Sequence, residues 1–302
     1  MFALKRRLYA AISKKFMNDC SSYNSLEVRK GCRSKKQARD MFAAHSVPHA
    51  QGKIFFGPIS ARKFVKEHGF PVVIKPNVSG FSRGSYFPIT NYKELYKALI
   101  LAKLWWPTTV IEKYLQGKNY RVVVVDNEIM SAIERFPPTV VGNGLDSIRM
   151  LADTENKIRE KMGLFPTIYP IKETEQTIKH LAKQGLNFDS IPKNAQTITL
   201  FYRIALAPGG TIDTVDKSMI ADQNKALFIE VLKMFNANIL GIDIIMEQGL
   251  DVPHDQQKCI LLEVNSRPYL KMHDVPRNGK KEDLSSYYQK LDSLNIAQTD
   301  VF

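Results

Sequence analysis

Apolar and polar positions along the chain follow two patterns, one with the period of a strand and one with the period of a helix. Runs rich in β-branched residues predict strands at 54–56, 72–75, 85–89, 110–113, 121–125, 128–136, 197–202, 239–246 and 259–264. Apolar residues three or four positions apart predict helices at 34–46, 61–68, 92–104, 147–161 and 223–235, and Ser34 is suited to cap the first of them. Residues 173–194 look irregular or partly helical.

Helices and strands interleave, but dipeptides that favour tight turns, such as Asp126-Asn127 and Gln248-Gly249, separate several of the strands. Strands joined by such short turns are antiparallel, whereas a doubly wound sheet is mostly parallel. The pattern therefore predicts an α+β fold instead of one doubly wound parallel sheet. The chain has 302 residues, which allows two or three subdomains.

Composition narrows the class of protein. Hydrophobic residues make up 44% and charged residues 24% of the chain, as in an ordinary globular protein. No apolar run reaches the roughly 18–20 residues that cross a bilayer, so we expect no transmembrane segment. Cys20, Cys32 and Cys259 form no CxxC pair, which argues against a disulfide framework or a structural zinc site. This cysteine usage fits a reducing compartment, and we expect a cytoplasmic location.

The formal net charge is +13, and part of the excess lies near the N-terminus. Basic surfaces attract polyanions, which include nucleic acid, anionic lipid, nucleotides and acidic substrates. We interpret residues 1–27 as a basic N-terminal extension. Within it, residues 1–17 have the apolar spacing of a helix that packs on its own domain, lies on a membrane surface or serves as an organellar presequence. No aromatic-rich RNA-binding motif is present, so nucleic acid is not the expected partner.

Acidic residues interrupt two apolar strands near the C-terminus. Asp243 stands in the middle of one strand, and Glu263 and Asn265 lie two positions apart, on one face of the other. A buried carboxylate without a partner is costly. Oxygen donors gathered around Mg²⁺ would neutralise these acids. The alternative is that both acids form structural ion pairs with Arg or Lys.

Two other stretches suit nucleotide chemistry. Lys75 ends a buried strand and precedes residues 77–84, a loop of small residues whose N–H groups could hold phosphate, although the loop has no Walker A or Rossmann spacing. Glu112 and Lys113 end another strand, and Leu115 follows in a short hinge. Backbone groups at such a hinge can bond an adenine edge while Leu115 packs on the ring. A solvated hairpin and an ordinary strand-turn-strand are the alternatives.

Taken in order, and with Val141-Gly142-Asn143-Gly144 and Glu155-Asn156 between them, these stretches resemble the ATP-grasp superfamily. The resemblance covers about residues 29–277 and is greatest to the branch that contains the ATP-grasp part of cyanophycin synthetase and the bifunctional glutathione synthases. It implies an ATP-grasp fold in which two α/β subdomains grip ATP between them. The implied N-terminal, lid subdomain is 28–110. The implied C-terminal subdomain is 111–302, with the metal site and a family-specific insertion around 140–200.

The resemblance also implies roles for individual residues. Lys35 and Lys75 match the lysines that reach ATP phosphate, and Glu112, Lys113 and Leu115 match the adenine hinge. Asn119 stands where relatives carry an acid that contacts ribose. The remaining matches are a loop that closes over the phosphates, the ligands of Mg²⁺ or Mn²⁺, and arginines that steady the transferred phosphoryl group: Ser79, Gly80, Ser82 and Gly84; Asp243, Glu263 and Asn265; Arg121 and Arg135, with Arg203 a weaker candidate.

The implied activity is that of an ATP- and Mg²⁺-dependent carboxylate–amine ligase. It would join an amino acid or peptide, expected to be acidic, through an acyl phosphate, and release ADP and phosphate. Departures at Asn119, Ala205 and Tyr269 suggest a changed substrate side or a weakened enzyme. The chain also stops soon after the metal strand, so we expect a stand-alone ligase that does not make cyanophycin. A small-molecule kinase and a nucleotide-binding or nucleic-acid-associated protein without catalysis are the alternatives, and a homodimer is left open.

Overall fold

The computed structural model describes residues 23–32, 34–78 and 84–293. Contacts divide the chain into two compact units. Unit 1 consists of Met1–Ala132, Asp216–Leu270 and Glu282–Phe302, and unit 2 consists of Ile133–Val215 and Lys271–Lys281. In the part of the chain that the structure describes, no helix is both long enough and apolar enough to cross a membrane.

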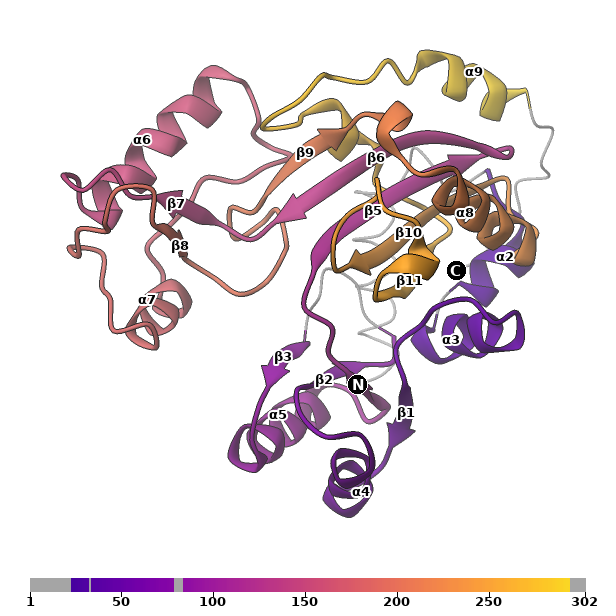
Figure 1. The fold of residues 1–302 in the computed structure, drawn as a ribbon, viewed down its shortest axis with the longest axis horizontal. Helices are drawn as coiled ribbons and strands as arrows, with labels where there is room; N and C mark the ends of the chain where they lie inside the picture. Colours follow the sequence, from indigo (N-terminus) through magenta and orange to yellow (C-terminus); the bar gives the residue numbers. More distant parts are fainter. Residues whose placement is uncertain (1–22, 33, 79–83, 294–302) are drawn as a thin grey trace. The chain divides into compact units, whose positions relative to one another are not determined.

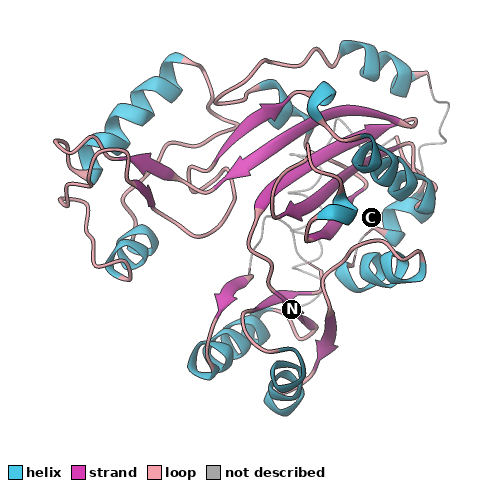
Figure 2. Cartoon of the chain, in the orientation of Figure 1, coloured by secondary structure: helices cyan, strands magenta, loops and turns pink. Residues whose placement is uncertain are grey.

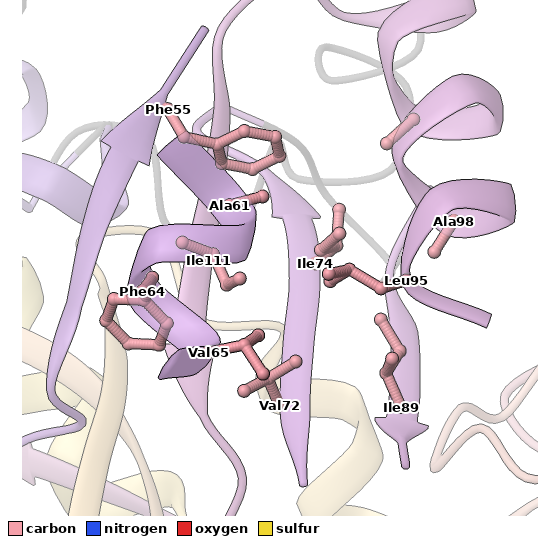
Figure 3. Close-up of a cluster of buried hydrophobic side chains, with 11 residues drawn as sticks. Phe55, Ala61, Phe64, Val65, Val72, Ile74, Ile89, Leu95, Ala98 and Ile111 are labelled. Atoms are coloured by element: carbon pink, nitrogen blue, oxygen red, sulfur yellow. The ribbon is translucent and has the colours of Figure 1, made fainter. Parts of the chain in front are cut away.

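Unit 1 contains a four-stranded antiparallel sheet with one apolar face. Its order is β1 (Gly52–Phe55), β4 (Thr109–Lys113), β2 (Val72–Pro76) and β3 (Tyr86–Ile89). Helices α4 (Pro58–His68) and α5 (Tyr92–Trp105) cover this face, where Phe64, Ile74 and Ile111 are at most 2% exposed (Figure 3). Because side chains alternate along a strand, the positions next to Ile74 and Ile111, which are Lys75 and Glu112, point to the other face.

A second, five-stranded sheet has the order β11 (Cys259–Asn265), β10 (Ile239–Met246), β5 (Lys118–Val125), β6 (Glu128–Phe136) and β9 (Thr211–Val215) (Figure 1). The turn between β5 and β6 is Asp126-Asn127, with φ of 44° and 65°, a left-handed conformation that Asp and Asn tolerate better than most residues. Helix α8 (Asp222–Met234) buries Leu227, Phe228 and Val231 and contacts β5 and β10.

Three more helices belong to unit 1: α2 (Leu26–Gly31), α3 (Lys35–Ala44) and α9 (Ser285–Asp292). Tyr287 and Tyr288 of α9 pack beside Leu270 and Ile239 of the second sheet's core. Short 3₁₀ turns lie at Lys217–Met219, His254–Gln256 and Leu270–Asp274. Figure 2 shows how helices, strands and loops alternate along the chain.

Unit 2 has a small core of its own. Its two-stranded sheet pairs β7 (Thr139–Val141) with β8 (Thr197–Thr199), and its helices are α6 (Ile148–Lys161) and α7 (Glu175–Ala182). Val140, Ile148, Leu181 and Leu200 form the centre of this core. The proposed insertion at 140–200 lies within this unit.

The predicted α+β class is confirmed, and β6 and β10 have the predicted bounds. Helix α7 lies in the stretch 173–194 that looked irregular or partly helical from the sequence, and α2, β7, β9 and α9 were not predicted. The predicted strand at 197–202 is shorter in the structure, where β8 ends at Thr199.

Candidate functional site

The first turn of helix α3 contacts the end of β2 and the strand β11. Ser34 caps it, as predicted, since its hydroxyl accepts a hydrogen bond from the Gln37 N–H. Asn77, just after β2, accepts from the Lys35 N–H through its carbonyl and from the Lys36 N–H through its side chain, both at 3.0 Å. The first turn is therefore fixed to the end of β2. From there the Lys35 Nζ lies 3.4 Å from the Glu263 Oε2 on β11.

Glu112 lies between two cations on the polar face of the four-stranded sheet. Its carboxylate is 2.5 Å from the Lys75 Nζ and 3.1 Å from the Arg39 Nη1. These three side chains are 5%, 9% and 11% exposed, so water screens the charges little. Gly52 stands opposite Glu112, and a Cβ there would come within 2.4 Å of the Glu112 side chain. The missing side chain leaves room for the cluster.

Arg121, Asp243 and Glu263 form a row across three neighbouring strands. Asp243 on β10 is the register partner of Arg121 on β5 and of Glu263 on β11. Arg121 donates two hydrogen bonds to the Asp243 carboxylate, at 2.7 and 2.8 Å. Burial lowers the pKa of Arg121, but the charge and hydrogen bonds of Asp243, together with the charge of Glu263, outweigh it and raise this pKa. Both acids thus lie on one face of the sheet.

The predicted metal ligands are brought together, and their chemistry fits Mg²⁺. Asn265 is the register partner of Gly241, two positions along β10 from Asp243. The Asn265 Nδ2 is buried and has no hydrogen-bond partner within the described ranges, so its own contacts do not fix which way this amide points. Two carboxylates and an amide supply the hard oxygen atoms that Mg²⁺ prefers. Here Asp243 and Glu263 lie in ion pairs, which is the arrangement that the alternative interpretation expected.

The predicted adenine hinge is held by hydrogen bonds from one side chain and one backbone N–H. The Lys113 Nζ donates to the carbonyls of Gly69 and Phe70, at 3.1 and 3.2 Å. The Tyr114 N–H donates to the Pro71 carbonyl at 3.1 Å. These bonds tie the hinge to the turn before β2, and Leu115 beyond it is half-buried.

Several other predicted nucleotide-binding positions can also be placed. Asn119 is buried on β5, where its register partner is Ile245. Gly84 has a φ of 73°, and a Cβ there would lie 2.7 Å from the Trp106 ring. Ser79, Gly80 and Ser82 lie outside the described residues.

Two of the three predicted catalytic arginines belong to unit 2, while Arg121 belongs to unit 1. Arg135 is half-buried on β6. The Arg203 guanidinium lies over the rings of Phe201 and Tyr202, and its Nε donates to the Tyr202 hydroxyl at 3.1 Å. Their catalytic roles stay predictions.

The Glu155-Asn156 pair, singled out in the sequence, makes structural contacts within unit 2. Glu155 accepts two hydrogen bonds from Arg277, at 2.9 and 3.0 Å, and one from Arg159 at 2.9 Å. Burial raises the pKa of Glu155, but these hydrogen bonds and charges outweigh it, so the pKa lies below its usual range. The Asn156 side chain makes two hydrogen bonds of 2.8 Å with the backbone of Ile171. These contacts hold α6 to the loops around it.

Sequence reasoning missed Arg39 and Asn77. A signal for Arg39 was available, because it lies four positions after Lys35, on the same face of the helix. Asn77 carried no separate signal, because its role depends on where α3 docks.

Comparison with solved structures identifies the fold. A bifunctional glutathione synthetase from Pasteurella multocida matches 90% of this chain and 38% of its own, with a TM-score of 0.64 and 24% identity. The ATP-grasp ligase PsnB matches 90% of this chain and 63% of its own, with a TM-score of 0.51 and 15% identity. The family described as D-ala D-ala ligase C-terminus matches residues 57–187. The chain has the fold of the ATP-grasp ligases.

Curated relatives agree with the branch that the sequence resembles. A glutathione biosynthesis bifunctional protein of Clostridium perfringens is 30% identical over 82% of this chain and 32% of its own length. A cyanophycin synthetase of Crocosphaera subtropica is 29% identical over 72% of this chain and 25% of its own length. The chain thus spans about a quarter to a third of these relatives.

Proposed function

We propose that this ATP-grasp chain is an ATP- and Mg²⁺-dependent ligase that joins the carboxylate of an amino acid or peptide to an amine. The observation that carries the proposal is the set of ion pairs in unit 1, where Lys35, Lys75 and Arg121 each meet an acid of the metal and hinge strands. Relatives named as synthetases and ligases, one of them solved with Mg and ADP, support it. With it we propose subdomains 28–110 and 111–302, and 1–27 as a basic extension.

Lys35 and Lys75 are the proposed phosphate-binding cations. Both are largely buried, so their charge acts through a medium of low dielectric. Asp243, Glu263 and Asn265 would hold Mg²⁺, or Mn²⁺, and the metal would draw charge from the phosphate oxygens when bound. Where Glu263 gives up its contact with Lys35 to a metal, Lys35 is left available to the phosphates.

In the proposed reaction a substrate carboxylate oxygen attacks the γ-phosphorus of ATP, and ADP leaves. The amine nitrogen then attacks the acyl carbon, phosphate leaves, and the nitrogen loses a proton. Both steps gather negative charge, which fixed cations stabilise without reorganisation. We assign this role to Arg121, with Arg135 and Arg203 as further candidates. The loop of Ser79, Gly80, Ser82 and Gly84 is the proposed cover that excludes water from the acyl phosphate.

The proposed substrate is acidic. Arg267 follows the metal strand by two positions. Burial and the charge of Arg29 lower the pKa of Arg267. The local field therefore favours an anion, which a carboxylate side chain of the substrate would supply.

The test combines turnover with isotope transfer. The protein is incubated with Mg²⁺, ATP and pairs of amino acids and short acidic peptides, and ADP is measured. A donor labelled with ¹⁸O in its carboxylate should pass one labelled oxygen to the released phosphate. A stable phosphorylated product in place of an amide would indicate a kinase, and no ADP above background with any pair would count against the proposal.

Matched variants separate the site from general damage. Glu263→Gln and Lys75→Met should lower turnover by about 100-fold or more. Lys63→Met and Glu67→Gln remove an exposed pair on α4 with the same chemistry and should leave the rate unchanged. Equal rates in all four variants would remove the site assignment.

A further inference from the structure

One face of α3 carries two cations to two different sheets. Lys35 and Arg39 are four positions apart, so they lie one turn apart on the same side of the helix. Lys35 reaches Glu263 on β11, and Arg39 reaches Glu112 on β4. Glu112 in turn holds Lys75 at 2.5 Å. The acid that holds Lys75 thus has a second partner on the helix that carries Lys35.

Once ATP binds as proposed, the Glu112 carboxylate and a phosphate of ATP compete for Lys75. It must leave the Glu112 carboxylate, at least in part, to reach a phosphate oxygen. Glu112 is only 5% exposed, so if Lys75 were its one partner, the departure of Lys75 would leave a buried charge uncompensated. Removing one partner of a buried ion pair is strongly unfavourable. A second cation that stays behind removes most of that penalty.

We infer that Arg39 is a positioning residue that keeps Glu112 charge-compensated, so that Lys75 is free to move to the phosphates. This inference rests on the proposed function. Arg39 is suited to the task because its planar guanidinium presents several N–H donors to a carboxylate in a fixed geometry. The contact is also closely fitted: a Cβ at Gly52 would lie 3.1 Å from the Arg39 Nη1 and 2.4 Å from the Glu112 Cγ.

The experiment compares Mg²⁺–ATP binding, by calorimetry, in the wild type and in Arg39→Met, Arg39→Lys, Glu112→Gln and Arg39→Met with Glu112→Gln. Arg39→Met should weaken binding about tenfold or more, because Glu112 then retains Lys75. Arg39→Lys should bind close to the wild type. The double variant should regain most of the loss, because no carboxylate is left to compete. In kinetics, the loss should appear in KM for ATP more than in kcat.

Controls distinguish the inference from the proposed function. Lys36→Met, an exposed lysine one position from Lys35 that pairs with Asp40, should bind ATP as the wild type does. If the wild type binds no nucleotide, the proposed function fails. If Lys75→Met abolishes binding while Arg39→Met binds like the wild type, only the role of Arg39 is overturned. A double variant as weak as Arg39→Met also overturns it, because the loss would then not come from the competition for Lys75.

Discussion

Asp243→Asn is the substitution for which the structure changes the expectation most. From the sequence, this change or Glu263→Gln should abolish turnover and leave the fold intact. In the structure, Asp243 neutralises Arg121 through two hydrogen bonds, and the side chains are 5% and 13% exposed. An asparagine keeps the shape but removes the charge. The Arg121 guanidinium then stays buried without its main counter-charge.

The loss of stability expected for Asp243→Asn follows from this geometry. Breaking a buried ion pair by removing one partner costs about 3–5 kcal/mol. Glu263 also acts on Arg121 and compensates part of the lost charge, so we expect about 3 kcal/mol, at the lower end. Glu263→Gln should cost much less, because the Glu263 side chain is 32% exposed and its contact with Lys35 is longer, at 3.4 Å.

Urea unfolding followed by tryptophan fluorescence measures this loss, since the two tryptophans, Trp105 and Trp106, belong to unit 1. The variant that also carries Arg121→Met should recover much of the stability, because no unpaired charge is left. Glu67→Gln, on the exposed face of α4, is the control and should change stability by less than about 0.5 kcal/mol. A loss below about 1 kcal/mol for Asp243→Asn, or a double variant less stable than Asp243→Asn alone, would refute the reasoning.

Three further outcomes are expected. The pKa of Glu155 is lowered in the folded state, so the stability that the Glu155 carboxylate contributes is present above the ordinary carboxylate pKa and is lost as the pH falls from that value through the lowered pKa. Glu155→Gln should therefore flatten the acid dependence of hydrogen exchange in α6. Gly142→Ala places a Cβ 2.3 Å from a backbone carbonyl and should cost about 1–3 kcal/mol in thermal unfolding, whereas Gly31→Ala meets nothing within 4 Å and should not destabilise. Burial raises the pKa of Cys32 to about 12 and of Cys259 to about 11. Alkylation of these two thiols by iodoacetamide at pH 8.5 should therefore be slow until urea is added, and fast alkylation of either thiol in the folded protein would contradict this burial.

The sequence alone determined most of the elements and predicted the chemistry of the candidate site. Strands β6 and β10 and the Ser34 cap follow from local pattern, because burial of alternate side chains and capping of free N–H groups act within a few residues. The types of the site residues, Lys75 and Asp243 among them, were also readable, because nucleotide and metal chemistry requires cations and oxygen donors.

Only the tertiary structure decided which charges pair. That Arg121 meets Asp243 depends on the register of β5 against β10, 122 residues apart in the chain. That Arg39 meets Glu112 depends on how α3 docks, and no local pattern encodes that distance. Cross-strand register and helix docking are set by the packing of the whole core. The partner of a buried charge, and so the cost of removing it, is therefore a property of the folded chain.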